Sequence, residues 1–288
     1  MTQTRKLGGA DVFPIGLGAM PMSLSGRPPE EQSIRAVHAA LDAGVNLIDT
    51  ADAYSVDRSD VGHNERLIAK ALQGRREGVL VATKGGHTRT HDGGWRLDGS
   101  REHLRAACEA SLKALDTDRI DLYQFHRPDP DVPYAESIGA LKELQDEGKV
   151  RWIGISNADT DQIEEALAIA DIVSVQNELS LEHTAPIGYG EVELCAERGI
   201  AFLPWSPLGG IAKAADAAAA HDPVQQVADA HGVSPQRVAL AWLLALSPVV
   251  IPIPGASRPE SIQDSAAAVE LQLSQEELQA IGRIAQAA

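Results

Sequence analysis

A repeated unit along the chain constrains the fold more than any other feature of the sequence. A short apolar run is followed by a loop, an amphipathic segment and another apolar run. Most runs are rich in Ile, Leu and Val without polar alternation, which is typical of strands buried on both faces. Eight such runs occur, at residues 14–18, 47–49, 79–83, 120–125, 152–156, 172–176, 200–204 and 249–253.

The segments between the runs carry the start signals of helices. Ser100 is predicted to be an N-cap, and Ser234–Pro235 combines an N-cap with proline at the first helical position. Ser274 and Glu277 predict a capping box before an extra C-terminal helix. The alternation predicts an α/β fold, a (β/α)8 TIM barrel forming a single domain over residues 1–288. A doubly wound open sheet is the alternative, because alternation does not show closure.

The segment before the first run, residues 5–13, is predicted to form a β-hairpin around Gly8–Gly9. We expect this hairpin to plug the lower end of the barrel. Pocket walls at the opposite end are expected from the loops 86–99, 181–190 and 209–223.

Composition and charge exclude several classes of partner. The chain has 41 acidic and 25 basic side chains and a net charge of −16, which disfavours nucleic acid and anionic membrane surfaces. The longest apolar run, residues 238–246, is far shorter than the roughly 20 residues that span a bilayer. Cys108 and Cys195 lie in no motif, and no leader segment precedes the fold, so a cytoplasmic location is expected. The sequence leaves the oligomeric state open.

Four candidate catalytic residues stand at or after the ends of successive predicted strands. Asp49 ends the second run and Tyr54 lies five residues later, Lys84 follows the third run, and His126 follows the fourth. Taken alone, each has a plainer reading as a loop cap, a surface aromatic or a loop histidine. In a barrel the carboxyl ends of the strands converge on one mouth, where such enzymes carry their sites. We therefore expect these four side chains to face one another.

These four residues resemble the Asp-Tyr-Lys-His tetrad of the aldo-keto reductase family, in that family's order. The stretches 44–51, 118–129 and 153–157 are close to family signatures, and the resemblance runs from about residue 7 to residue 268. It implies an NADPH-dependent oxidoreductase that reduces an aldehyde or ketone carbonyl to an alcohol by hydride transfer. Tyr54 would be the proton donor.

The tetrad has a physical rationale. Free tyrosine has a pKa of about 10, which is high for proton transfer at neutral pH. An ammonium group about 4 Å away lowers that pKa by up to about three units at an effective dielectric constant near 20. We therefore expect Lys84 to bring the pKa of Tyr54 near neutrality, with Asp49 holding the ammonium and His126 donating to the substrate oxygen.

The resemblance also implies contacts with the cofactor. Ser156, Asn157 and Gln176 match positions that hold the nicotinamide carboxamide, and Trp205 matches the aromatic ring that stacks on the nicotinamide. Further cofactor contacts are expected from Met20, Asp49, Ser206, Pro207, Leu208 and Gly209.

The adenosine end departs from the common family pattern. Many members carry Lys followed by Ser or Thr after the last strand, with an Arg six residues beyond the Lys. Gly255, Ala256 and Ser261 stand at these places here. The segment 254–260 nevertheless resembles a bacterial variant of this region, so Gly255 and Ala256 remain candidate cofactor contacts.

Other residues near this segment can replace the missing ones. Ser257 and Arg258 precede a predicted helix start and are expected to bind a 2′-phosphate. Asp264 and Ser265 fall where other members contact adenine. NADPH is therefore expected as the cofactor in preference to NADH.

Trp95, in the loop after the third run, is a candidate substrate contact, although it would equally serve to cover the barrel rim. No Rossmann or Walker motif occurs, and no spacing typical of a metal site is found. His87 and His91 are expected to face solvent.

Two other functions remain open. Lys84 would form a Schiff base in an aldolase-like barrel enzyme. Alternatively, the chain would bind cofactor as a regulatory subunit without turnover, as some relatives of this family do. Beyond a small carbonyl compound, the residues identify neither the physiological substrate nor the direction of the reaction.

Overall fold

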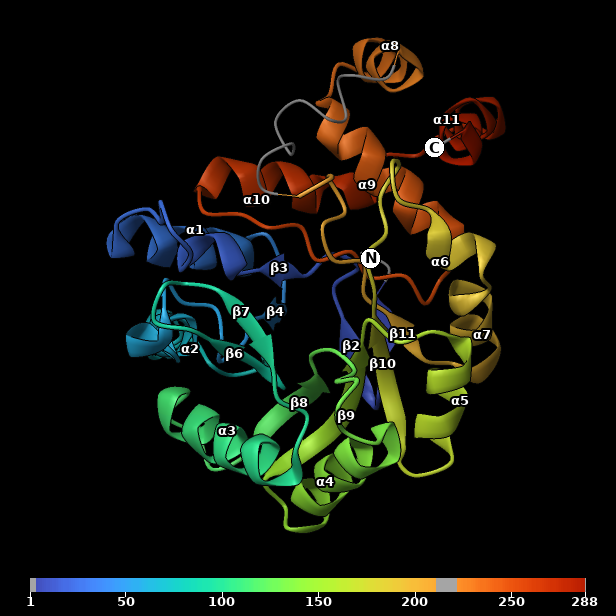
Figure 1. Ribbon diagram of the computed structural model, residues 1–288. Helices are drawn as coiled ribbons and strands as arrows, with labels where there is room; N and C mark the ends of the chain where they lie inside the picture. The colour runs from blue at the N-terminus through green and yellow to red at the C-terminus, as the bar shows by residue number, and fades with distance from the viewer. Residues whose placement is uncertain (1–3, 211–221, 288) are drawn as a thin grey trace.

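The structure, a computed structural model, describes residues 4–210 and 222–287, and within them seven parallel strands form one curled sheet (Figure 1). The sheet order is β11-β10-β9-β8-β5-β4-β3. The strands are β3 (Leu17–Gly18), β4 (Leu47–Asp49), β5 (Leu80–Gly85), β8 (Ile120–Phe125), β9 (Val150–Ser156), β10 (Ile172–Gln176) and β11 (Ala201–Phe202). Each of the first seven predicted runs therefore overlaps a strand, although the first and seventh strands are shorter than predicted and β5 and β9 extend beyond the predicted runs.

The eighth predicted run, 249–253, closes the barrel without forming a regular strand. Pro252 within the run and Pro254 directly after it have no N–H to continue a ladder. The N–H of Ile251 still donates to the carbonyl of Phe202 at 2.7 Å, and the N–H of Gly18 donates to the carbonyl of Pro254 at 2.9 Å. The segment therefore joins β11 to β3, and the sheet is a closed barrel, not the doubly wound alternative.

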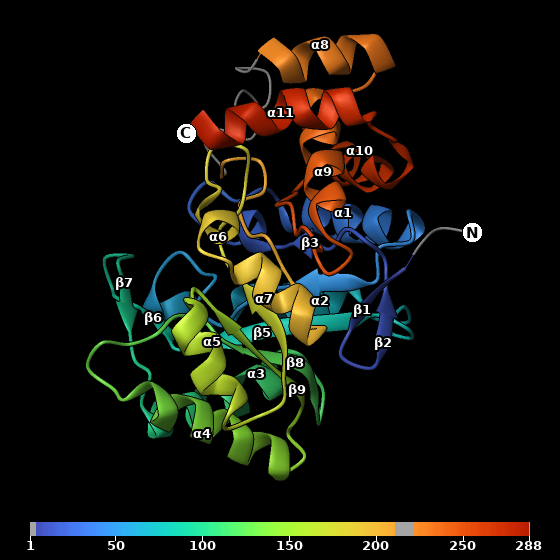
Figure 2. The same cartoon turned by 90° about the vertical axis from the view of Figure 1, so that its right-hand side faces the viewer.

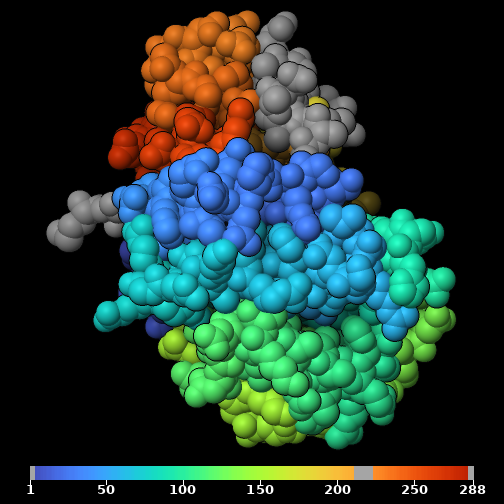
Figure 3. All heavy atoms as spheres, turned by 90° about the vertical axis from the view of Figure 1, so that its left-hand side faces the viewer, coloured from blue at the N-terminus to red at the C-terminus, as the bar shows by residue number. Residues whose placement is uncertain are grey.

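The helices lie outside the sheet, and Figure 3 shows the side chains of the first three covering one flank of it as a continuous surface. The helices are α1 (Glu30–Asp42), α2 (His63–Ala71), α3 (Arg101–Ala114), α4 (Tyr134–Asp146), α5 (Thr160–Leu167), α6 (Ala185–Gly188), α7 (Glu191–Arg198), α8 (Asp222–His231), α9 (Pro235–Leu246), α10 (Pro259–Ala266) and α11 (Gln275–Ala287). Short 3-10 turns occur at Met20–Met22, Arg58–Asp60 and Ala267–Glu270. Among the described residues, no helix is both long enough and apolar enough to cross a bilayer.

The predicted caps are confirmed. Ser100 accepts a hydrogen bond from the N–H of His103 at the start of α3, and Ser234 accepts one at the start of α9. Ser274 and Glu277 form the reciprocal capping box, with distances of 2.7 and 3.2 Å, at the start of the extra helix α11.

Two hairpins lie at opposite ends of the barrel, as Figure 2 shows. β1 (Arg5–Leu7) and β2 (Ala10–Val12) pair antiparallel, and their buried Leu7 and Val12 pack against interior side chains of the barrel such as Leu122. The predicted plug is thereby confirmed. β6 (His87–Arg89) and β7 (Trp95–Leu97) follow β5 at the other end, the mouth formed by the carboxyl ends of the strands.

Gly86 turns the chain from β5 into β6. Its φ of +108° favours glycine, and a Cβ there would meet the ring of Phe125 at 2.8 Å. The loop 209–223, expected to form a pocket wall, falls largely outside the described residues.

Candidate active site

A cavity of about 920 Å³ opens at the carboxyl ends of the strands. Asp49, Tyr54 and His126 line it beside the barrel axis, and Ser257 and Arg258 line it near the start of α10. The structure therefore brings three residues of the predicted tetrad and the predicted adenosine end into one continuous cavity, whereas Lys84 is fully buried and does not line it.

Lys84 is the centre of the tetrad. Its fully buried ammonium donates to Oδ1 of Asp49 at 2.6 Å, to the carbonyl of Thr50 at 2.9 Å and to the hydroxyl of Tyr54 at 3.0 Å. Each of its three N–H groups therefore has a partner, so the ammonium is fixed in position.

The second oxygen of the Asp49 carboxylate is held from two other strands. Oδ2 accepts a hydrogen bond from Gln176 at 2.8 Å and another from Gln124 at 3.2 Å. Gln124 lies on β8 and Gln176 on β10, so this carboxylate links four strands of the barrel. Gln124 was not singled out in the sequence, although it stands only two residues before His126.

The titration of Tyr54 differs from the expectation. Burial raises the pKa of Tyr54 above its usual value, although Lys84 acts to lower it. Burial lowers the pKa of Lys84, but Asp49 and Tyr54 outweigh that effect and the net pKa is raised. The expected fall of the tyrosine pKa towards neutrality is therefore wrong for this structure, because burial destabilises the phenolate more than the neighbouring ammonium stabilises it. At neutral pH Tyr54 keeps its proton and Lys84 keeps its charge.

His126 is buried against two aromatic neighbours. Its ring lies 5.8 Å from the ring of Tyr54 in an edge-on arrangement and 4.2 Å from the ring of His87. Burial, followed by the influence of His87 and Lys84, holds the pKa of His126 well below its usual value. The imidazole is therefore neutral at neutral pH and able to donate one N–H.

His87 was expected to face solvent, and that prediction was wrong. Both of its ring nitrogens are buried without a partner among the described residues, and the ring lines the cavity. Burial, together with Arg127 and two other cations, lowers the pKa of His87 to about 4. Alternation along β6 was the signal that sequence reasoning missed, since His87 and Arg89 share the face that Trp95 joins from β7.

Polar side chains at the ends of β8, β9 and β10 are linked to one another. Asn157 has a left-handed backbone with φ of 58°, and its Nδ2 donates to the carbonyl of His126 and to Oγ of Ser156, both at 2.9 Å. Its Oδ1 accepts from Arg127 at 2.9 Å, and Ser156 donates to the carbonyl of Gln176 at 2.7 Å. This network fixes the residues predicted to hold a nicotinamide.

All but one of the remaining predicted contact residues line the cavity. Gly209 does not line the cavity, whereas its neighbour Gly210 does. The other predicted residues that line it are Met20, Trp95, Ser156, Asn157, Gln176, Trp205, Ser206, Pro207, Leu208, Gly255, Ala256, Asp264 and Ser265. The sequence did not indicate Gly18, Pro21, Leu24 or Gln236, which also line it.

The adenosine end is built from loop and helix residues. Arg258 is the N-cap residue of α10 and forms no ion pair with any described residue. Asp264 is already engaged, because it accepts from Arg237 at 2.6 Å and from the hydroxyl of Ser234. Within residues 4–210 and 222–287, no group of three or more His, Cys, Asp or Glu side chains is arranged to hold a metal ion.

Comparison with known proteins gives a consistent result. The model of the Aldo/keto reductase family matches residues 14–286. A probable aldo-keto reductase of Glycine max is 35% identical over 98% of this chain and 89% of that protein. The structure of a thermostable aldo-keto reductase, Tm1743, with the inhibitor epalrestat has a TM-score of 0.83 and 30% identity, over 98% of this chain and 99% of that one. An aldo/keto reductase from Klebsiella pneumoniae, in complex with NADP and acetate, has a TM-score of 0.83 and 28% identity, over 98% and 95% of the two chains.

Proposed function

The chain belongs to the aldo/keto reductase family, and on that basis we propose that it reduces aldehyde or ketone carbonyls with NADPH, using Tyr54 as the proton donor. Family membership itself makes the protein an NAD(P)H-dependent oxidoreductase. When bound, the nicotinamide supplies the hydride. The roles of individual residues and the preference for NADPH are the parts that we propose.

The cavity fits a nicotinamide dinucleotide. Nε1 of Trp205 is buried in the cavity wall without a hydrogen-bond partner, and Arg258 at the far end has no ion-pair partner among the described residues. Donors left unpaired in this way suit a ligand with several acceptor oxygens. Ser156, Asn157 and Gln176 add hydroxyl and amide groups to the lining of the same cavity.

A single observation carries the proposal, which is the position of the Tyr54 hydroxyl 3.0 Å from the buried Lys84 ammonium, in the cavity that His126 also lines. Tyr54 gives its proton to the carbonyl oxygen as charge develops there. Lys84 stabilises the phenolate that remains, and Asp49 holds Lys84 in place. Neutral His126 donates a hydrogen bond to the same oxygen and orients the carbonyl group.

The same geometry disfavours a Schiff base on Lys84. The side chain is 0% exposed and its nitrogen makes three hydrogen bonds, so attack on a carbonyl would require a proton and all three partners to be given up. A regulatory subunit would bind NADPH without reducing a carbonyl compound. A measurement of carbonyl reduction therefore distinguishes it from the proposed function.

The decisive experiment is Tyr54→Phe. We expect turnover of NADPH with a panel of aldehydes and ketones to fall about 100-fold or more, the usual worth of a general acid. The dissociation constant of NADPH should stay near the wild-type value, because the hydroxyl is assigned to proton transfer.

Tyr189→Phe is the matched control, since Tyr189 is 76% exposed and does not line the cavity. A Tyr54→Phe enzyme that keeps most of its carbonyl-reducing rate would contradict the assignment. A wild type that binds NADPH but reduces nothing in the panel would support the regulatory alternative.

A further inference from the structure

One end of the cavity is lined by aromatic side chains, two imidazoles and a guanidinium. Tyr54, His87, Trp95, His126 and Arg127 line it around the tetrad. This set consists of a phenol, an indole, two neutral imidazoles and a single guanidinium. The reacting carbonyl needs only Tyr54 and His126, so the other three side chains are available to the rest of the substrate.

Arg127 supplies an uncompensated positive charge at this end. It lies directly after His126, is exposed, and makes one side-chain hydrogen bond to a described residue, to Oδ1 of Asn157 at 2.9 Å. It forms no ion pair within the described part of the chain. A guanidinium has five N–H donors, so four remain for a ligand.

His87 supplies unused hydrogen-bonding capacity beside it. Its two ring nitrogens are buried and have no partner in the described part of the chain, while its ring contacts His126, with 4.2 Å between the ring centres. Leaving a buried polar atom unpaired is costly, so a partner from the ligand side is expected. The groups whose charges influence His87 are Arg127, Lys84 and Arg89, all cations.

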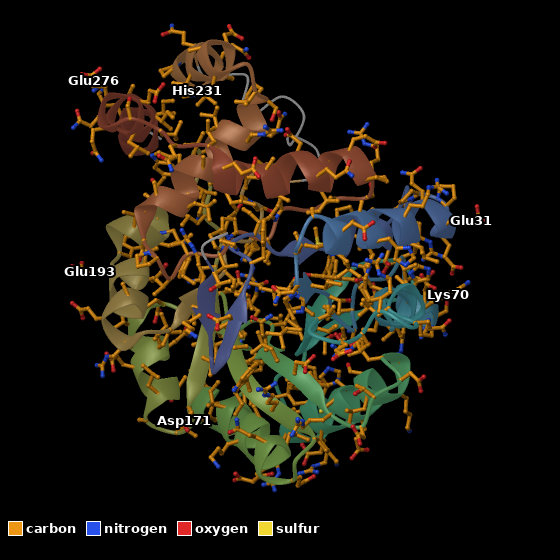
Figure 4. All side chains as sticks on the ribbon, turned by 180° about the vertical axis from the view of Figure 1, so that it is seen from behind. Glu31, Lys70, Asp171, Glu193, His231 and Glu276 are labelled. Carbon is orange, nitrogen blue, oxygen red and sulfur yellow. The ribbon has the colours of Figure 1, made fainter. Side chains whose placement is uncertain are left out.

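Negative charge is scarce at this end, although the protein carries a net charge of −16. Asp49 is the one carboxylate lining the cavity here, and both of its oxygens are bonded within the tetrad network. The other lining carboxylates among the described residues, Glu260 and Asp264, belong to α10 at the opposite end. Charged residues such as Glu31 and Glu193 instead point outward from peripheral helices, as Figure 4 shows.

We propose that the substrate carries a carboxylate group close to its reacting carbonyl, and that Arg127 and His87 bind this carboxylate. The inference rests on the proposed function and names the substrate class of the same site. One guanidinium with a neutral imidazole matches a single negative charge. A phosphate monoester, with nearly two charges, would call for a second cation, and Arg89 is instead turned against the ring of Trp95 at 3.9 Å.

The test compares matched substrates. The three positional isomers of carboxybenzaldehyde are each paired with the neutral methyl ester of the same isomer, and kcat/KM is measured with NADPH at one ionic strength. We expect at least one isomer to be preferred over its ester by about 10-fold or more. 4-Formylphenyl phosphate serves as the phosphate counterpart.

Substitutions assign the preference to residues. Arg127→Met should lower the acid-to-ester ratio of kcat/KM by about 10- to 150-fold, the range of a charge-assisted hydrogen bond. His87→Phe keeps the ring against His126 but removes both nitrogens, and should lower the ratio by a smaller factor. Arg96→Met is the control, since exposed Arg96 does not line the cavity and its loss changes the net charge equally.

The outcomes separate the possible failures. Equal losses for acid and ester in Arg127→Met would mean that Arg127 acts through Asn157, and a wild type without acid preference would equally overturn the inference. A preference for the phosphate would overturn the assignment to a carboxylate. If no aldehyde is reduced at all, the proposed function fails. Binding of 4-(hydroxymethyl)benzoate to the NADP complex, measured by fluorescence in wild type and Arg127→Met, then still decides whether a carboxylate binds there.

Discussion

The two ends of the cavity are built by different means. At the tetrad end, Asp49 and Lys84 lie on strands, are buried, and have their polar atoms bonded to groups from four strands. At the adenosine end, Ser257 and Arg258 stand on the segment leading into α10, where Arg258 has no ion-pair partner in the described structure. The same cavity thus joins a site centred on a buried, fully hydrogen-bonded ion pair to one made of loop and helix residues.

This difference explains where the sequence agrees with the family pattern and where it departs from it. A buried charge without its partner is strongly destabilising, so replacing one member of the tetrad harms folding as well as chemistry. An exposed phosphate-binding cation can stand at different sequence positions in different family members with little effect on stability, because any cation near the ligand supplies the attraction. The tetrad follows the common pattern, whereas the usual lysine and arginine of the adenosine end are missing.

The largest effect is expected at the tetrad end, for Lys84→Met. Loss of the ammonium leaves Asp49 buried and uncompensated, which should lower the free energy of unfolding by about 3–5 kcal/mol. Turnover should fall by about 100-fold or more because the phenolate loses its neighbouring charge. Urea unfolding and steady-state kinetics measure the two effects.

Two controls accompany this variant. Lys113→Met removes an exposed lysine of α3 and should change neither quantity appreciably. Asp49→Asn combined with Lys84→Met should recover part of the stability but not the turnover. Unchanged stability in Lys84→Met would refute the view that the tetrad is also a structural unit.

The next effect separates catalysis from cofactor binding. His126→Ala should reduce turnover by about 100-fold, as expected for the loss of one hydrogen bond to the developing oxyanion. Its NADPH dissociation constant, measured by fluorescence titration, should stay close to that of wild type. If cofactor binding were the main loss, His126 would belong to the binding half of the cavity.

At the adenosine end we expect a substitution that weakens the binding of NADPH but not the binding of NADH. Arg258→Ala should weaken NADPH binding by about 10- to 150-fold, equivalent to about 1.5–3 kcal/mol for a charge-assisted contact with the 2′-phosphate. NADH lacks this phosphate and should bind the variant and the wild type alike. Dissociation constants for both cofactors at one ionic strength test this, and equal losses, or a wild type that prefers NADH, would show that Arg258 does not bind the phosphate.

The smallest expected effect is a pH dependence of the free energy of unfolding that comes from His87 at the tetrad end. His87 has a pKa of about 4 in the folded protein, against about 6.5 when unfolded, so the unfolded state binds more protons between these values. Its contribution to stability is present above pH 6.5 and is lost as the pH falls towards 4. In His87→Phe the acid-induced loss of unfolding free energy should be smaller by about 1 kcal/mol at pH 5.5. Identical pH profiles for the two proteins would contradict the burial of this ring.

Much of the fold was predictable because its signals are local. Ser100 caps α3 through the N–H three residues later, and Ser274 pairs with Glu277 over the same short distance. The position of Lys84 directly after a buried apolar run also identified it as a residue with a special role. Such contacts depend on sequence neighbours and on secondary structure, both of which can be inferred from the chain alone.

The sequence by itself determined the alternation of strands and helices, the helix caps and the strand ends at which the tetrad stands. Only the tertiary structure decided that the proline-containing segment 249–253 closes the barrel without forming a regular strand, that His87 turns inward against His126, and that burial outweighs Lys84 in setting the pKa of Tyr54. Each of these depends on groups far apart in the chain and on the water that folding removes from them. Desolvation belongs to the assembled interior, so it cannot be read from any one stretch of residues.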